Sequence, residues 1–235
     1  MLAVKPPSVA AAARNNAEWC DLMCRAHGTG GTFGAHTWST PVRSPRFYPD
    51  AVTLDAEARV DDLLTRVDTG TGCSCKDSFA SLDLTPAGFR VLFDAEWIFH
   101  PPAPVAPSHE PSTWVRITDP GELSGWEAAW AGSDDAASLF HAEILDDPNV
   151  LVLCDRADGA IVDGAIFNRA ANVVGVSNAF SCRGDLDATW TGVTRAAHTY
   201  FPNEVIVGYE SGADLAAARH HEFVALGPLR VWVND

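Results

Sequence analysis

The chain has 235 residues, 47% hydrophobic and 20% charged, so a folded core is expected over most of its length, and no apolar run approaches the ~20 residues of a membrane-spanning helix. The net charge is −15, with 13 acidic and 9 basic side chains in residues 1–112 and 18 and 7 in residues 113–235. Such an acidic chain disfavours nucleic acid as a partner, because it repels phosphate backbones. The acidic residues either form an ordinary solvated surface, which is the interpretation we favour, or attract a cationic substrate such as an amine.

The amino-terminal residues 1–13 are small and interrupted by prolines, and they lack the apolar centre of a secretory signal. We interpret them as a flexible tail and expect the protein to be cytoplasmic. Residues 15–28 (NNAEWCDLMCRAHG) are predicted to form a helix, because their apolar side chains fall on one stripe and Gly28 supplies a stop.

The other predicted elements of the first half are shorter. The glycine-rich loop 28–34 neither follows a strand nor opens an obvious helix, so phosphate binding is not predicted there. Residues 39–50 are punctuated by prolines and should be extended. An amphipathic pattern predicts a helix at 55–68, and residues 73–84 and 88–99 are predicted to form strands.

Two features of the first half have more than one interpretation. Arg43 and Arg46, in the extended segment, either fix a carboxylate or phosphate of a substrate or belong to a loop whose rings pack on the sheet. Lys76 and Asp77 are expected to form an exposed pair on a strand.

The clearest break in the chain is HPPAPVAPSHEPS, residues 100–112, which holds five prolines and no apolar periodicity. We interpret it as a stiff linker. It divides the chain into an amino-terminal half, residues 14–99, and a carboxy-terminal half, residues 113–235.

The second half has a more regular pattern. Its first helix begins with Thr118 or Asp119 as a cap and a proline in the first turn, and Pro148 stops the second helix. Helices are predicted at 118–132, 134–148, 189–201 and 211–223, and strands at 149–155, 161–169, 172–181, 204–210 and 226–233. This order predicts a mixed sheet with helices on both faces.

This order of elements, with the strand NVVGVSNAFS and the loop SCRGDLDATW after it, resembles the GNAT (GCN5-related N-acetyltransferase) superfamily, whose members move acyl groups from coenzyme A thioesters to amines. The resemblance covers residues 113–235. It implies an α/β (α+β) fold with a GNAT-like mixed, mostly antiparallel sheet and helices on both faces. The segments Gly88–Trp97 and Phe223–Trp232 are alike, so the first half is either a degenerate GNAT-like repeat, which would make the fold tandem, or simply has a strand that ends in an aromatic residue.

The resemblance implies that an acyl-CoA binds where the strand 172–181 separates from the strand 204–210 and at the start of the helix between them. Backbone groups of the first strand would meet the pantetheine arm, and the loop 181–190 would hold the pyrophosphate. The residues implied in acyl-CoA binding are Asn178, Ala179, Phe180, Arg183, Gly184, Ala188 and Ser211.

The phosphate loop departs from the family's pattern in two respects. Arg183 and Ala188 match its ends, but Leu186 stands where the pattern has a glycine. Asp185 and Asp187 add negative charge, which a helix start also favours for capping.

The catalytic candidates are Glu210, Tyr209 and Ser177. Glu210 ends the strand 204–210, where it either serves as the base for the amine, directly or through water, or caps the next helix. The tyrosine that the family often uses as a general acid is replaced by Ala218, so Tyr209 is an alternative donor, while Ser177 either hydrogen-bonds a substrate or is an ordinary strand residue.

The predicted function is transfer of an acyl group from acetyl-CoA or another acyl-CoA to the amine of a small molecule. Two alternatives stay open: a non-catalytic GNAT-like binding or scaffolding module, and a GNAT-type transferase that uses a carrier protein or aminoacyl-tRNA. No metal is predicted, because neither cysteine pair, Cys20 with Cys24 or Cys73 with Cys75, has zinc-site spacing. These thiols are expected to be free and buried.

Overall fold

A computed structural model describes residues 5–102, 112–133 and 138–235, in which one mixed sheet of 11 strands runs through both halves of the chain. The strands are β1 (Thr32–Phe33), β2 (Thr37–Ser39), β3 (Ala51–Thr53), β4 (Ser74–Asp77), β5 (Arg90–His100), β6 (Val115–Arg116), β7 (Val150–Ala157), β8 (Ala160–Ala170), β9 (Val173–Ser181), β10 (Ile206–Glu210) and β11 (Val224–Val233). The helices are α1 (Val9–Ala26), α2 (Val60–Leu64), α3 (Pro120–Ala131), α4 (Leu186–Tyr200) and α5 (Gly212–His220), with short 3-10 turns at η1 (Thr85–Ala87) and η2 (Ala142–Asp146).

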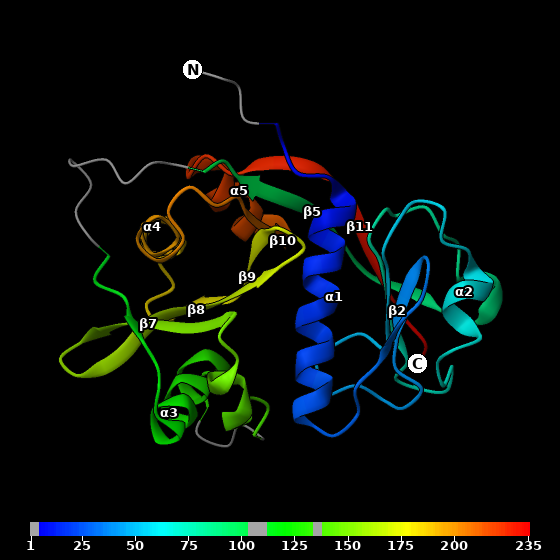
Figure 1. The fold of residues 1–235 in the computed structure, drawn as a ribbon, viewed down its shortest axis with the longest axis horizontal. Coiled ribbons are helices and arrows are strands. Elements are labelled where there is room, and N and C mark those ends of the chain that lie inside the picture. The colour runs from blue at the N-terminus through cyan, green and yellow to red at the C-terminus, as the bar shows by residue number, and fades with distance from the viewer. Residues whose placement is uncertain (1–4, 103–111, 134–137) are drawn as a thin grey trace.

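The strand order is β1-β2-β3-β4-β11-β5-β10-β9-β8-β7-β6, and among these neighbours only β3–β4 and β9–β10 are parallel. This confirms the predicted α/β class with a mixed, mostly antiparallel sheet. The long strand β5 of the first half lies between β10 and β11 of the second half and pairs antiparallel with both (Figure 1). The two halves therefore share one sheet and not merely an interface.

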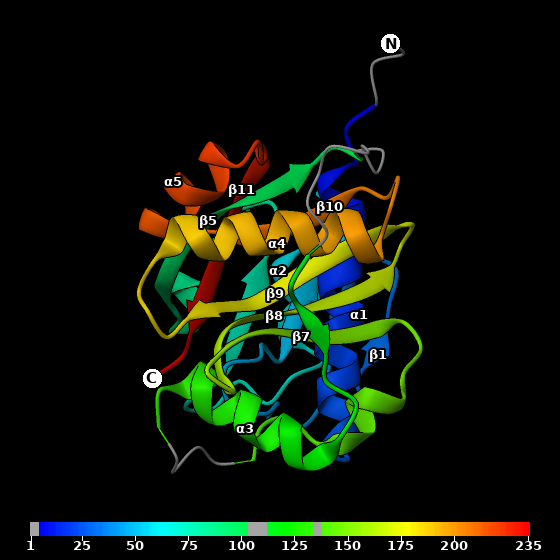
Figure 2. The same ribbon diagram turned by 90° about the vertical axis from the view of Figure 1, so that its left-hand side faces the viewer.

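Helices cover both faces of the sheet, as the sequence predicted. Figures 1 and 2 show α1 and α3 on one face of β7–β9, and α4 and α5 on the other. Trp19 of α1 and Trp126 of α3 belong to one buried cluster, whereas Trp190 of α4 and Ala218 of α5 belong to another. The sheet thus separates two cores, and any opening through it connects two differently lined spaces.

The first helix begins earlier than the sequence indicated. Residues 1–13 were predicted to be a tail, but α1 begins at Val9, because the Ser8 side chain caps it by accepting the N–H of Ala11 at 3.1 Å. Buried Ala12 and Ala13 pack against the sheet, so small residues mark a close helix–sheet contact here and not an absence of structure. Residues 1–4 lie outside the described part of the chain.

The predicted helix at 134–148 is wrong for the residues that the structure describes. Leu139 and Phe140 donate their backbone N–H groups to the two carboxylate oxygens of Glu127, at 2.6 and 3.3 Å, and only the 3-10 turn η2 follows. A buried carboxylate on α3 thus replaces the helix's own hydrogen bonds. Residues 134–137 lie outside the described part of the chain.

Other boundaries differ because short elements carry little periodic signal. The helix expected at 55–68 is reduced to α2, and the strand expected at 73–84 ends at Asp77, whose carboxylate accepts the N–H groups of Phe79 and Leu82 in a turn. The two- and three-residue strands β1, β2, β3 and β6 were not predicted. The proposed linker 100–112 was started one residue too early, because β5 extends through His100. Residues 103–111 lie outside the described part of the chain.

Burial corrects one expectation and qualifies another. Lys76 and Asp77 were expected to be exposed, but both are buried, with Lys76 only 3% exposed. All six cysteines are free; five are buried, and Cys182 is exposed. No helix among the described residues is long and apolar enough to cross a membrane.

Candidate functional site

Two parallel strands separate in the middle of the sheet. β9 and β10 pair only at Val174 with Ile206 and Gly175 with Val207, and beyond this point no pairing between them is recorded. β9 bends away at a bulge, where three steps from Ser177 to Phe180 oppose two steps on β8 and Asn178 has a φ of +54°. This is the position at which the sequence predicted a separation.

A pocket of about 280 Å³, here called the central pocket, opens at this separation. Its walls come from α1, the segment 47–49, β4, α3, β9 and β10. The lining residues are Asn16, Trp19, Cys20, Phe47, Tyr48, Pro49, Lys76, Trp130, Val176, Ser177, Asn178, Ala179, Tyr209 and Glu210. All three predicted catalytic candidates are therefore brought together, with two of the residues implied in acyl-CoA binding, Asn178 and Ala179.

Three polar atoms at the central pocket are buried without a hydrogen-bond partner among the described residues. They are the Tyr48 hydroxyl, Ser177 Oγ and Asn178 Oδ1. Buried polar groups in native proteins are nearly always paired, and an unpaired one costs on the order of 1–3 kcal/mol. Their convergence on one pocket favours a polar ligand there.

Tyr209 and Glu210 lie on opposite faces of β10 although both line the pocket. Tyr209 packs edge-on against Trp97, with ring centroids 5.4 Å apart, on the face that α1 covers. Glu210 ends β10 just before α5, and the negative charge of Asp214 on that helix helps to raise its pKa. The helices that line the pocket, α1 and α3, cover the same face of the sheet, and Glu210 contributes to the pocket from the end of β10.

Glu210 is a carboxyl group with a strongly shifted pKa. Burial disfavours its charged form, and together with the neighbouring negative charge of Asp214 this raises the pKa from 4.5 to about 8. An ordinary glutamate is too weak a base to accept a proton from an alkylammonium ion, because its pKa is far below that of the ammonium group. The raised pKa of Glu210 narrows the difference between the two pKa values. Carboxyl groups tuned in this way cluster at functional sites.

The sequence left open whether Glu210 caps the helix that follows. α5 begins after Ser211, which makes no side-chain capping bond, and Glu210 accepts no hydrogen bond from the first turn of α5 in the described structure. Of the two interpretations, the geometry favours a carboxyl group that is available to a ligand.

Arg183, the basic residue of the proposed phosphate loop, is already paired. Its guanidinium donates to buried Asp163 on β8 and lies 4.0 Å from Asp155 on β7. The pairing with Asp163 raises the pKa of Arg183 further. The guanidinium is thus drawn toward the sheet and is not free to neutralise a phosphate without leaving Asp163.

The start of α4 is acidic and self-capped. The carboxylate of Asp185 accepts the N–H of Ala188 at 3.0 Å, Asp187 pairs with His221 at 2.9 Å, and Gly184 takes the left-handed conformation (φ +68°) that the turn needs. Phe180, the last of the implied acyl-CoA-binding residues on β9, packs against Trp126 of α3 in the core, with ring centroids 5.2 Å apart. These residues do not line the central pocket.

Sequence reasoning missed the residues that the first half adds to the site. Asn16, Trp19 and Cys20 come from α1, and Lys76 comes from β4, all far from β9 and β10 in the sequence. The one available signal was the cluster of aromatic and basic residues at 39–50, which does supply Phe47 and Tyr48.

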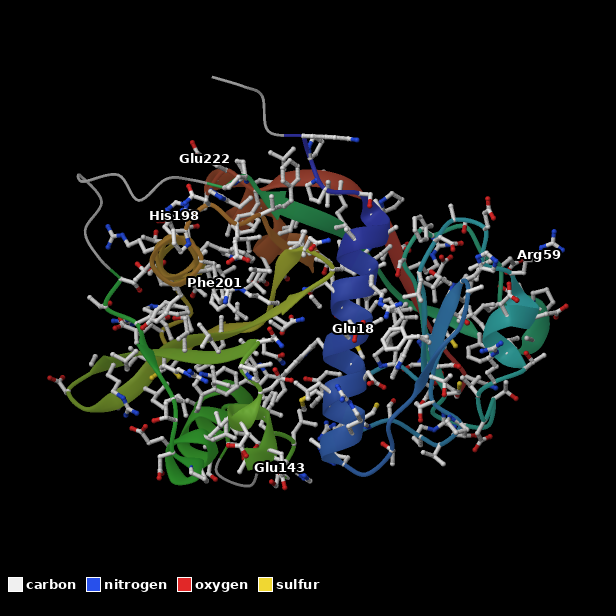
Figure 3. The ribbon with its side chains drawn as sticks, in the orientation of Figure 1. Glu18, Arg59, Glu143, His198, Phe201 and Glu222 are labelled. Atoms are coloured by element: carbon white, nitrogen blue, oxygen red, sulfur yellow. The ribbon has the colours of Figure 1, made fainter. Side chains whose placement is uncertain are left out.

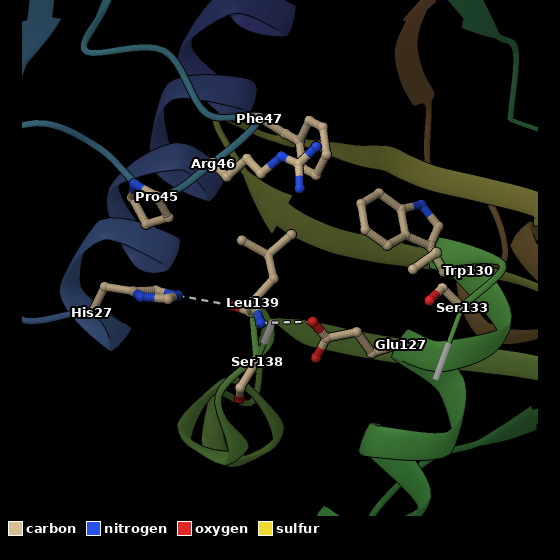
Figure 4. Close-up of a pocket in the computed structure, with 10 residues that line it drawn as sticks. His27, Pro45, Arg46, Phe47, Glu127, Trp130, Ser133, Ser138 and Leu139 are labelled. Carbon is tan, nitrogen blue, oxygen red and sulfur yellow. Dashed lines mark hydrogen bonds between the residues drawn. The ribbon is translucent and has the colours of Figure 1, made fainter. Parts of the chain in front are cut away.

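Two larger pockets adjoin the central pocket. The helix pocket, about 640 Å³, lies between the end of α1, α3 and the segment 45–47, and it shares Phe47 and Trp130 with the central pocket (Figure 4). The strand pocket, about 650 Å³, lies along β4, β5 and β11 and shares Phe47, Tyr48, Lys76 and Tyr209. The Phe47 ring packs edge-on against the Trp130 ring, with ring centroids 5.7 Å apart. Phe47 lines all three pockets and so lies where they meet.

No group of three histidine, cysteine or acidic side chains in the described part of the chain is arranged to hold a metal ion. The proposal of chemistry without a metal rests on the sequence and stays a prediction.

Comparison with known proteins identifies solved structures with a similar fold. No family model matches the sequence, and no curated protein matches it. Among solved structures, a GCN5-related N-acetyltransferase from Kribbella flavida aligns with a TM-score of 0.59 at 12% identity, over 94% of this chain and 95% of that one. A protein described as an acetyltransferase of the GNAT family, from Novosphingobium aromaticivorans, aligns with a TM-score of 0.55 at 14% identity, over 96% and 99% of the two chains.

The fold is therefore GNAT-like, as the sequence predicted. The similarity extends over nearly the whole chain, whereas the sequence resemblance covered residues 113–235. Whether the first half is a degenerate repeat stays a prediction.

Proposed function

We propose that the protein is an N-acyltransferase that moves an acyl group from an acyl thioester, with acetyl-CoA or another acyl-CoA as donor, to the amine of a small molecule. The observation that carries the proposal is the convergence of Glu210, Ser177 Oγ and Asn178 Oδ1 on a pocket at the separation of β9 and β10. The GNAT-like fold of the whole chain supports it.

In the proposed reaction the acceptor nitrogen attacks the thioester carbonyl, a C–N bond forms and the C–S bond breaks. Glu210 accepts the proton that the nitrogen loses, and the departing thiolate takes a proton from Tyr209 or from water. Ser177 and Asn178 orient the acceptor by accepting hydrogen bonds from its N–H groups. Holding the two reactants in one small pocket supplies much of the rate enhancement.

The donor's thioester arm fits this chain better than its phosphates do. The unpaired backbone of β9 and β10 beyond Gly175 and Val207 offers hydrogen bonds to the amides of a pantetheine arm. The loop before α4 offers phosphates only Arg183, already paired with Asp163, and places Asp185 and Asp187 beside them. Phosphate binding would therefore depend on backbone N–H groups at the start of α4.

This acidic loop is also the observation that favours the alternatives. A GNAT-like binding module without transfer chemistry does not need the phosphates, and neither does a transferase whose donor is a carrier protein. Aminoacyl-tRNA is the least compatible donor, because the net charge of −15 opposes a polyanion.

Thermal unfolding with acetyl-CoA and with acetyl-pantetheine, which lacks the nucleotide, tests the proposal. We expect both to stabilise the protein, by about 2.7 kcal/mol at a hundredfold excess over the dissociation constant. A shift with both compounds but little difference between them would assign binding to the pantetheine arm. The absence of any shift with acetyl-CoA and with longer acyl-CoA thioesters would refute the CoA-dependent function.

A further inference from the structure

The inference concerns Lys76, a buried cation that has no acidic partner among the residues that the structure describes. Its side chain, on β4, is 3% exposed, and its Nζ donates to Asn16 Oδ1 at 2.6 Å and lies 4.1 Å from the centre of the Tyr209 ring. It lines both the central and the strand pocket. The ammonium group is therefore inside the protein and adjacent to space that a ligand can fill.

No carboxylate of the described residues lies within 4.0 Å of this ammonium group, although the chain has 31 acidic and only 16 basic side chains. The missing partner of Lys76 does not reflect a shortage of acidic residues, since Arg43 and Arg183 each pair with a buried aspartate. Burying an unpaired cation is costly, and an ammonium has three donors, of which Asn16 takes one. Among the described residues Nζ makes no other hydrogen bond, so its remaining N–H groups, which lie beside the Tyr209 ring, can donate to an acceptor that enters the pocket.

The rest of the central pocket offers the opposite chemistry. Glu210, Ser177 Oγ and Asn178 Oδ1 are acceptors for an amine, and Lys76 and Glu210 form no ion pair with each other in this structure. A molecule with both an amine and a carboxylate would satisfy the two ends at once. The volume of about 280 Å³ suits a small molecule, and Trp19, Tyr48 and Trp130 supply apolar walls.

We propose that Lys76 binds a carboxylate of the acceptor, so that the acceptor is a small amino acid and not a simple amine. The role of the ligand as acyl acceptor rests on the proposed function, whereas the binding of its carboxylate by Lys76 does not. Arg46 supports it as a second cation near the entrance: its guanidinium lies 4.5 Å from the centre of the Phe47 ring, it makes no ion pair with the described residues, and it lines both adjoining pockets (Figure 4).

The test compares amino acids with their carboxamides, which keep the amine and the side chain but lose the anionic carboxylate. L-leucine, L-phenylalanine and L-methionine, each beside its amide, are used as probes. Binding is measured by calorimetry without an acyl donor, and transfer by release of free thiol from acetyl-CoA. The wild-type protein should bind at least one acid about 10- to 100-fold more tightly than its amide, the range expected of a hydrogen bond to a charged group.

The decisive variant is Lys76→Met, which keeps most of the side chain's length but removes the charge. It should weaken binding of the acid to the level of the amide and leave the affinity for the amide within about threefold of wild type. Lys76→Arg should recover part of the preference. The control is Arg59→Met, since Arg59 is exposed beside α2 and points away from the molecule (Figure 3); it should change neither affinity.

Stability separates a ligand-binding lysine from a structural one. If Lys76 serves a ligand, Lys76→Met should melt at the wild-type temperature or above it, because a desolvated cation has been removed. A large loss of stability with equal loss of acid and amide binding would assign Lys76 to the core and overturn the proposal.

The remaining outcomes are equally distinct. Equal binding of acids and amides by the wild type, or no binding of either, would overturn the proposal. A dependence on Lys76 that appears only with succinyl-CoA, whose acyl group carries a carboxylate, would assign the lysine to the donor and overturn the acceptor assignment. Binding that prefers the acid, without any acyl transfer, would support carboxylate binding by Lys76 and contradict the proposed transferase. Equal acyl transfer to the acid and to its amide would support the transferase and overturn carboxylate binding by Lys76.

Discussion

Glu210 is the residue on which the proposed chemistry depends most directly, and its position explains its titration. It ends β10 at the strand separation, where burial and Asp214 raise its pKa to about 8. At neutral pH roughly one molecule in ten then carries the carboxylate form in the absence of ligand. A base of this kind becomes more available as the pH rises through 8.

We expect Glu210→Gln to reduce the transfer rate about 10²- to 10⁴-fold near neutral pH, with partial recovery at higher pH as free amine becomes available. The matched control is Glu96→Gln: Glu96 lies opposite Glu210 on β5 but pairs with Arg219. Steady-state rates between pH 6 and 9 are the measurement. Wild-type activity in the Glu210 variant would remove this residue from the mechanism.

The same residue predicts a pH-dependent stability difference. Between pH 4.5 and 8 the folded protein holds the Glu210 proton that the unfolded chain has lost, so this group lowers the free energy of unfolding as the pH rises, by at most about 1.4 kcal/mol per pH unit. Glu210→Gln lacks this titration. Urea unfolding at pH 5 and pH 8 should therefore show that the free energy of unfolding of the variant, relative to the wild type, is higher at pH 8 than at pH 5. The same difference at both pH values would contradict the raised pKa.

At the scale of elements, one buried amide holds α1 against the sheet. Asn15 Nδ2 donates to the backbone oxygens of Asn168, Ala170 and Val173, at 3.0, 3.2 and 3.3 Å, and so ties the helix to the end of β8 and the start of β9. The contact is close because Gly175 has no side chain: a Cβ there would lie 2.0 Å from Asn15 Oδ1. This contact fixes the helix that carries Asn16, Trp19 and Cys20 into the central pocket.

Gly175→Ala should therefore destabilise the protein by about 1–3 kcal/mol, because the added methyl group overpacks the interface and displaces Asn15. Chemical denaturation measures the effect. Gly125→Ala is the control, because Gly125 is an exposed helical position on α3 with nothing within 4 Å of a new Cβ, and there alanine should stabilise by up to about 1 kcal/mol. Equal effects at the two sites would contradict the close contact.

At the scale of the whole molecule, β5 joins the two halves of the chain. It pairs with β10 from Glu96 to His100 and with β11 from Arg90 to Phe99. Removing it would expose the edges of two strands in the centre of the sheet and uncover Trp97 and Ile98, both buried. The pairing is thus part of the core of both halves.

A protease site inserted within residues 103–111 tests this arrangement. After cleavage, the two fragments should elute together in gel filtration and unfold in a single transition, because neither can bury its strand edges alone. The uncut protein with the same insertion is the control. Fragments that separate without denaturant and stay folded would contradict the prediction.

The sequence by itself determined the fold class and most of the regular elements of residues 113–235, apart from β6 and the helix expected at 134–148. Periodic apolar residues with clear caps placed α3, α4, α5 and β7–β11 within a few residues. The separation between β9 and β10 was implied by the resemblance to the GNAT superfamily and not by the pattern itself. It also pointed to Glu210, Tyr209 and Ser177, which the structure brings to one pocket. Local pattern suffices for helices and strands because each of these elements is shaped largely by neighbours in the chain.

Only the tertiary structure decided what depends on distant residues. The sequence placed Lys76 on the surface, because a lysine beside an aspartate is usually solvated, but its environment is made by α1 and β10, far from it in the chain. Arg183 matched a phosphate-binding pattern, but Asp163 on another strand holds it. The helix expected at 134–148 was likewise overridden by a carboxylate on α3, because a long-range hydrogen bond to buried backbone outweighs weak local propensity.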